Sequence, residues 1–119
     1  MSEEYLAKIR DVSQSMGAKT FIVIIPSCFE VDRSEWEKRG LGSLYSDDFF
    51  NKNMTRFSER FTQFGTIRKI STLPLLPDLR NSRIRPLYLS RDSHWNKDGH
   101  RLAAEAIYNY LKEGILNEY

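Results

Sequence analysis

The sequence predicts an α/β domain in which a short, mainly parallel sheet is flanked by helices, as a partial three-layer α/β/α fold. Amphipathic helical segments alternate with short apolar runs along the chain, and this alternation favours parallel strands joined by right-handed crossovers. Residues 20–25 form an apolar run without polar alternation, which is typical of a parallel strand covered on both faces. Gly17 and Pro26 bound this run on either side.

Length and composition fit one ordinary globular domain, residues 1–119. Of the 119 residues, 40% are apolar and 29% are charged, and the net charge is +2. So small a charge gives no support for a nucleic-acid or membrane surface. The single cysteine, Cys28, excludes an internal disulfide framework and a cysteine-rich zinc site. No apolar run is long enough to span a membrane, and the chain as given carries no export signal, so we expect a soluble domain.

A first helix is predicted over residues 3–16, directly before the strand of residues 20–25. Four apolar side chains recur at helical spacing and therefore share one face: Tyr5, Ile9, Val12 and Met16. Gly17 follows at the position where glycine commonly ends a helix.

Residues 27–47 mix charged, glycine and small polar residues without clear periodicity. A stretch of this length is uncommon inside a compact domain, and such stretches are usually functional lids or insertions. The alternative is a short helix over residues 34–38, in which Trp36 covers part of the core. Both interpretations remain open from the sequence.

The clearest helix is predicted over residues 48–64. Its aromatic and apolar side chains recur at steps of four and three residues: Phe50, Met54, Phe57, Phe61 and Phe64. Such a stripe is far more often a core face than a cofactor site. Gly65 is expected to end this helix. A short strand over residues 66–70 and a turn or irregular helix over residues 73–79 should follow.

Residues 87–90 are a brief strand candidate, and the last helix is predicted over residues 97–112. Asn96 precedes this helix as a preferred N-cap residue, and Gly114 follows as a stop signal. Three strands make a thin sheet, so we expect it to belong to a larger sheet or to bind a partner.

Both histidines of the chain lie in residues 92–100, between the last predicted strand and the last predicted helix. Ligands and catalytic groups gather at such positions in open α/β sheets. Asp92 and His94 are two residues apart, so on an extended segment their side chains point the same way. The carboxylate then accepts a hydrogen bond from the imidazole and leaves the other ring nitrogen free as a base. We interpret Asp92 and His94 as candidate catalytic residues, two-thirds of a nucleophile-activating triad.

Three neighbours are expected to support this pair. Trp95 can wall the site, Asn96 fixes the start of the next helix, and His100 packs against the site rather than acting as the base. One alternative is an incidental polar loop, since short patterns often match by chance. Another is a metal site at Asp92, His94 and His100, which lacks a cysteine or further histidine to complete tetrahedral zinc. We expect no metal at this site.

Residues 88–104 resemble the C-terminal motif of SGNH (GDSL-type) hydrolases, closest to the branch that includes the alginate O-acetyltransferase-like proteins. The shared pattern is Asp-x-His-Trp-Asn followed by Gly-His and a helix. Residues 17–27 also resemble a later central strand of that family. The resemblance implies a flavodoxin-like fold, of which this chain is the C-terminal portion, and it allows an extracytoplasmic location. It also implies a Ser-His-Asp triad, with Asp92 as orienting acid and His94 as general base, acting on an O-acyl ester such as an acylated carbohydrate.

The nucleophile motif of that family is missing, because no serine here follows Gly-Asp. Ser27 is expected to be a turn or capping residue, and Cys28 a small buried apolar residue. The serine would then come from an upstream segment or a partner, and this chain alone is expected to be inactive.

The alternative function is a non-catalytic interaction module that keeps the hydrolase fold. A nucleotide-binding flavodoxin-like domain is disfavoured, because the chain has no glycine-rich phosphate loop. No cofactor is expected.

Overall fold

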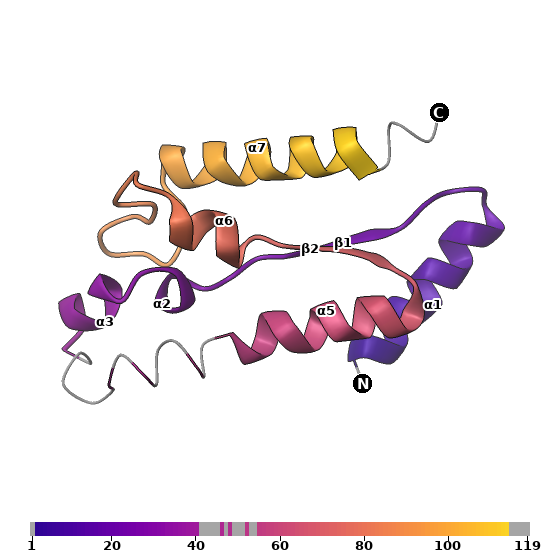
Figure 1. Ribbon diagram of the computed structural model, residues 1–119, viewed down its shortest axis with the longest axis horizontal. Coiled ribbons are helices and arrows are strands. Elements are labelled where there is room, and N and C mark those ends of the chain that lie inside the picture. The colour runs from indigo at the N-terminus through magenta and orange to yellow at the C-terminus, as the bar shows by residue number, and fades with distance from the viewer. Residues whose placement is uncertain (1, 41–45, 47, 49–51, 53–54, 115–119) are drawn as a thin grey trace.

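The computed structural model describes residues 2–40, 46, 48, 52 and 55–114. The elements follow in the order α1 (Ser2–Ser15), β1 (Phe21–Ile24), α2 (Cys28–Val31), α3 (Ser34–Lys38), α5 (Arg56–Arg68), β2 (Ser71–Pro74), α6 (Leu76–Asn81) and α7 (Lys97–Gly114). Figure 1 shows α7 along one face of the two strands and α1 with α5 on the other. The fold is therefore mixed α/β, with helices on both faces of a parallel sheet, as predicted.

The two strands pair in parallel, from Phe21 opposite Ser71 to Ile24 opposite Pro74. In the described part of the chain the sheet consists of these two strands. The strand predicted over residues 87–90 is wrong, since the only pairing there is an isolated antiparallel bridge between Tyr88 and Trp95. The chain turns back on itself between these two residues, so it cannot extend the sheet.

Helix α5 continues past Gly65, where the sequence predicted its end. Gly65 is buried, and a Cβ atom there would lie 2.0 Å from the Thr72 hydroxyl oxygen. The glycine therefore allows α5 to pack closely on β2 instead of stopping the helix. The helix ends at Arg68, and its C-cap residue Lys69 adopts a φ of +54°. The strand predicted over residues 66–70 is accordingly wrong, and β2 begins at Ser71.

Short helices α2 and α3 occupy the start of the stretch 27–47. Helix α3 coincides with the short helix expected over residues 34–38. Trp36 is buried, and its indole N–H donates to the Phe29 carbonyl at 2.9 Å. Residues 41–45 and 47 lie outside the described residues, as do Phe50 and Met54 of the predicted aromatic stripe. A lid or insertion over residues 27–47 therefore stays a prediction.

Helix α7 confirms the predicted last helix. Its buried Ala103 and half-buried Leu102, Ala106 and Ile107 pack on the larger of two apolar clusters. The buried members of that cluster are Cys28, Val31, Leu75, Leu76, Leu79, Leu87, Tyr88 and Ala103. Among the helices that the structure describes, none has the length and apolar character needed to cross a membrane.

The smaller cluster joins α1 to α5 and the sheet through Ala7, Phe64 and Ile70. Leu6 of α1 packs against it, and Arg60 of α5 donates to the Glu3 carboxylate at 2.7 Å. The face expected from the periodicity of α1 points outward instead: Tyr5, Ile9, Val12 and Met16 are between 55% and 79% exposed. Among the described residues this apolar face is uncovered.

Candidate active site

Residues 87–96 form a closed loop that brings the predicted site residues to the start of α7. The Leu89 amide donates to the His94 carbonyl at 3.0 Å, and the Asn96 amide donates to the Leu87 carbonyl at 2.9 Å. Leu87 and Tyr88 are buried. The base of the loop is thus fixed in the core, while its tip, with Asp92, faces solvent.

Asp92 and His94 are in direct contact at this tip. The Oδ1 atom of Asp92 lies 2.5 Å from Nδ1 of His94 and also accepts the backbone N–H of His94 at 3.1 Å. The expected approach of the two side chains is therefore present, but a turn produces it rather than an extended segment. An Asp side chain that accepts the backbone amide two residues on is a common turn-forming contact.

The contact sets the charge state of the pair. Hydrogen bonds from the His94 side chain and, secondarily, from its backbone amide lower the pKa of Asp92. An ionised Asp92 accepts a hydrogen bond from Nδ1–H, and in the neutral ring this geometry favours the tautomer with Nε2 unprotonated. Since the His94 side chain is 83% exposed, Nε2 is available to take a proton from a group brought to the loop.

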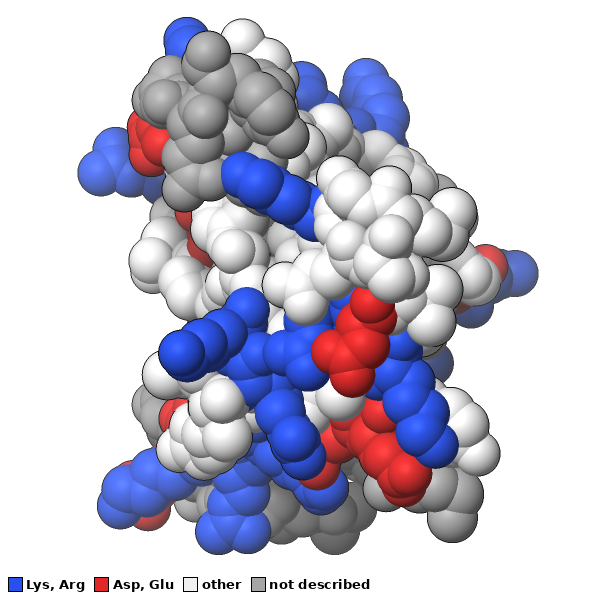
Figure 2. Space-filling model, turned by 90° about the vertical axis from the view of Figure 1, so that its right-hand side faces the viewer, with Lys and Arg blue, Asp and Glu red and all other residues white. Residues whose placement is uncertain are grey.

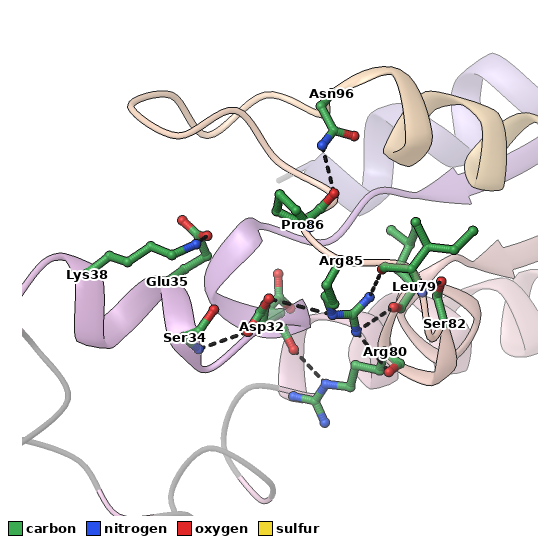
Figure 3. A network of polar contacts seen from close by, with 12 residues as sticks. Asp32, Ser34, Glu35, Lys38, Leu79, Arg80, Ser82, Arg85, Pro86 and Asn96 are labelled. Carbon is green, nitrogen blue, oxygen red and sulfur yellow. Dashed lines mark hydrogen bonds and ion pairs between the residues drawn. The ribbon is translucent and has the colours of Figure 1, made fainter.

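Asn96 fixes the loop to the helix that follows it. Its Oδ1 atom accepts the backbone amides of Asp98 at 2.9 Å and Gly99 at 3.0 Å, as an N-cap does. Its Nδ2 atom donates to the Pro86 carbonyl at 2.7 Å, as Figure 3 shows. One side chain thus ties the first turn of α7 to the segment that enters the loop.

The first turn of α7 packs tightly on that loop. A Cβ atom at Gly99 would lie 2.4 Å from the Leu87 carbonyl oxygen and 2.9 Å from Cβ of Trp95. Trp95 is half-buried, packs against the larger cluster and meets the His100 ring edge-on, with centroids 5.6 Å apart. His100 itself is exposed. The structure therefore brings Trp95 and His100 together at the start of α7.

Arg85 is a residue that the sequence analysis missed. Its Nη2 atom donates to the carbonyls of Leu79 and Arg80, both at 3.0 Å, and its Nε atom lies 3.5 Å from the Asp32 carboxylate. Figure 3 shows this guanidinium between α6 and Asp32, one residue before Pro86. A guanidinium that binds the last carbonyls of a helix fixes the direction in which the chain leaves it.

Tyr88 was also missed. Its hydroxyl donates to the Pro26 carbonyl at 3.4 Å, and burial raises its pKa to about 12. This contact places the loop beside the carboxyl end of β1, where ligands bind in open α/β sheets. The one sequence signal was an aromatic residue directly after the Pro86–Leu87 pair.

The two nucleophile candidates lie near the same strand end. Cys28 is fully buried in the larger cluster, as expected of a core cysteine. Ser27 is exposed at the N-cap position of α2, and its backbone amide donates to the Glu30 carboxylate at 2.7 Å. No hydrogen bond joins Ser27 to His94 in the described part of the chain. Among the described residues no three His, Cys, Asp or Glu side chains converge as a metal site would require.

A family model described as "SGNH hydrolase-like domain, acetyltransferase AlgX" matches residues 1–118. No curated protein and no solved structure matches the chain.

Proposed function

Because the chain belongs to the family of SGNH hydrolase-like domains of the acetyltransferase AlgX type, we propose that it supplies the acid and base of a Ser-His-Asp triad. The enzyme would be an ester hydrolase or O-acyltransferase, and its substrate an O-acyl ester carried on a carbohydrate. The observation that carries the proposal is the 2.5 Å contact between Asp92 Oδ1 and His94 Nδ1. It supports His94 as general base and Asp92 as the residue that orients it.

The chemistry follows from the free Nε2 atom of His94. This atom takes the proton of a serine hydroxyl as the serine oxygen bonds to the acyl carbon. Asp92 stabilises the imidazolium, which then gives the proton to the departing alcohol oxygen and leaves an acyl-serine. In the second half, His94 takes a proton from water or from an acceptor hydroxyl, and the serine regains it as the new acyl product leaves.

The serine in this proposal lies on an upstream segment or on a partner chain. No serine in the 119 residues follows Gly-Asp, Cys28 is inaccessible, and Ser27 stands at a helix cap. The exposure of His94 is consistent with the same assignment, because it leaves the ring accessible to a serine on either of these.

A second candidate function is a non-catalytic interaction module. The uncovered apolar face of α1 favours it, because contiguous exposed apolar surface often marks a protein–protein contact. Under this alternative, Asp92 and His94 are surface residues of a retained fold.

The reading frame upstream of Met1 separates the two functions at low cost. The enzyme proposal expects a strand followed by Gly-Asp-Ser there, or in an associated chain. If neither place holds that motif, the interaction module becomes the better account.

Kinetics then test the roles of the residues. In a preparation that contains the serine-bearing polypeptide, His94→Gln should lower kcat on 4-nitrophenyl acetate by about 10³-fold or more. Arg91→Gln, a change in the same exposed loop, should leave kcat near that of the unmodified protein. Equal activity of the His94 variant would contradict the proposal. If this chain alone turns over the ester and Ser27→Ala abolishes that turnover, the nucleophile is Ser27. The proposal that it lies on an upstream segment or a partner chain would then be wrong.

A further inference from the structure

Strand β1 has a free edge in the described part of the chain, because its only neighbour there is β2. The Leu75 amide donates to the Ile24 carbonyl at 3.1 Å, so the backbone groups of Ile24 and Ile22 point toward β2. Backbone groups of successive residues point to opposite sides of a strand. The N–H and C=O groups of Phe21 and Val23 therefore point away from β2, along the free edge, and no other described residue binds them.

The outer edge of β2 differs, because a proline lies on it. Pro74 is paired with Ile24, and the same alternation directs the backbone groups of Thr72 and Pro74 away from β1. Proline has no N–H to donate, so in sheets it is confined mainly to edge strands, where it discourages further pairing. The free edge of β1, Phe21–Ile24, carries neither a proline nor a charged residue. The outer edge of β2 is therefore suited to end the sheet, and the edge of β1 is not.

Both faces of β1 are covered, as in an interior strand. Val23 packs against the larger apolar cluster and Ile22 against the smaller one. Phe21 lies beside the ring of Tyr110 of α7, with centroids 6.3 Å apart. Strands that are apolar throughout and buried on both faces are typical of parallel sheets with helices on both sides. A further strand at the free edge is therefore expected to run parallel to β1.

The position of α1 indicates how such a strand would connect. Helices α1 and α5 lie on the same face of the sheet (Figure 1), and Ala7 of α1 and Phe64 of α5 share the smaller cluster. The chain passes from β1 through α5 to β2, and connections between parallel strands are right-handed in about 98% of cases. A strand that leads through α1 into β1 on that same face lies on the side of β1 away from β2. This side is the free edge.

A parallel strand on this edge ends near the candidate active site. The Tyr88 hydroxyl binds the Pro26 carbonyl just after β1, so the loop with Asp92 and His94 lies at the carboxyl ends of the strands. Figure 2 looks onto the opposite end, where both strands begin, and shows charged side chains gathered over the lower part of that view. A chain that enters an added strand at this end meets polar surface, and it leaves the strand on the side of the loop.

We propose that the free edge of β1 binds a further parallel strand, formed by the segment of the polypeptide that directly precedes α1. The N–H and C=O groups of Phe21 and Val23 pair with this strand, and β1 becomes an interior strand of a larger sheet. The identity of the strand rests on the proposed function in one respect, since the serine is taken to lie on that upstream segment rather than on a partner chain.

Amide hydrogen exchange tests this edge, measured by NMR on the 119-residue chain and on the polypeptide extended by the residues encoded before Met1. In the 119-residue chain the amides of Ile22 and Ile24 should be protected, and that of Val23 should exchange freely. In the extended polypeptide, exchange at Val23 should slow by at least about 100-fold, as expected of an amide that joins a core ladder. The Thr72 amide is the matched control on the outer edge of β2 and should keep its rate. Slowing at Thr72 instead of Val23, an unchanged rate at Val23, or an upstream reading frame without a strand-forming segment would overturn the proposal.

Two proline variants show whether the edge stabilises the extended polypeptide. Val23→Pro removes an N–H from the free edge, and Thr72→Pro removes one from the outer edge of β2. Both variants keep the donors of the ladder between β1 and β2. The extension should raise the denaturation midpoint, Val23→Pro should abolish most of that gain, and Thr72→Pro should retain it. An equal loss in the two variants would contradict the added strand.

Failure of the added strand and failure of the acyl transfer are distinguishable. In the extended polypeptide, His94→Gln should remove most ester turnover and leave the slow exchange at Val23 unchanged, because His94 takes no part in the ladder. Slow exchange at Val23 in a polypeptide without turnover supports the added strand and refutes the acyl transfer alone. Turnover with free exchange at Val23 refutes the added strand alone.

Discussion

The Asp92 carboxylate determines which nitrogen of His94 is left for chemistry. It accepts hydrogen bonds from both the ring Nδ1 and the backbone amide of His94. A single residue therefore orients the ring and bends the loop. Both side chains are exposed at the tip, and the ring is held by this contact rather than by burial. The geometry of the pair therefore depends directly on the protonation state of Asp92.

We expect the carboxyl group of Asp92 to titrate below its ordinary pKa of 3.8, because two hydrogen bonds from His94 favour its ionised form. Because the folded-state pKa of Asp92 is lowered, the carboxylate is ionised and the contact is formed at neutral pH. The contact and its stabilising effect are lost only as the pH falls through that folded-state pKa. His94→Gln should raise the pKa of Asp92 toward the ordinary value, though not fully, since the backbone amide remains. Carboxyl ¹³C NMR measures this, and an Asp92 pKa that is the same in both proteins would count against the contact.

Spacing in the sequence was enough to predict the meeting of Asp92 and His94, but not the turn that brings them together. Arg85 and Tyr88 could not be predicted, because their hydrogen bonds go to backbone carbonyls and the one carboxylate near Arg85, that of Asp32, is distant in the sequence. The accepting carbonyls belong to Leu79, Arg80 and Pro26, and the side chains of these residues do not reveal that their carbonyls will be bound. Contacts of this kind become visible only once the fold brings distant segments together.

The start of α7 is the element on which the loop depends. Asn96→Ala removes the oxygen that accepts the backbone amides of Asp98 and Gly99. It also removes the hydrogen bond to the Pro86 carbonyl. The loss should be about 1 kcal/mol of unfolding free energy. Asn96→Asp keeps the capping oxygen and removes only the donor to Pro86, so it should cost less. Chemical denaturation measures both, and a stability of the Asn96→Ala protein equal to that of the unmodified chain would show that the cap does not hold this helix end.

Close packing at Gly99 gives a second prediction for the same element. Gly99→Ala places a methyl group against the Leu87 carbonyl, and it should cost roughly 1–3 kcal/mol, as overpacking does. Gly114→Ala is the matched control, because a Cβ atom there meets nothing within 4 Å. The control should be neutral or slightly stabilising, since alanine favours a helix. Similar denaturation midpoints for the two variants would refute the tight contact.

Helical periodicity predicted α1, α7 and much of α5, but local signals misjudged where α5 ends. Gly65 resembles a stop signal in the sequence, whereas in the structure it serves contact with Thr72. The helix instead ends at Arg68, and its C-cap is Lys69, a residue type that rarely adopts a positive φ. A glycine that permits packing and a glycine that ends a helix look alike until the neighbouring strand is in place.

At the scale of the molecule, the chain is elongated and partly open. Its radius of gyration is 16.3 Å, against about 13.5 Å for a compact domain of this length. In the described part of the chain, the uncovered face of α1 and a sheet of two strands fit this openness. The sequence predicted a thin sheet in need of a larger sheet or a partner, but periodicity cannot tell which apolar face is covered. The openness supports the proposal that an upstream segment or a partner chain brings the serine to this loop.

The most direct test of an acid–base pair at Asp92 and His94 is the tautomer of the His94 ring, measured from its ¹⁵N chemical shifts at alkaline pH. The account predicts a proton mainly on Nδ1 and a free Nε2, because Asp92 accepts from Nδ1. In Asp92→Asn this preference should be lost. A ring that carries its proton on Nε2, or that is unchanged by Asp92→Asn, would contradict the account.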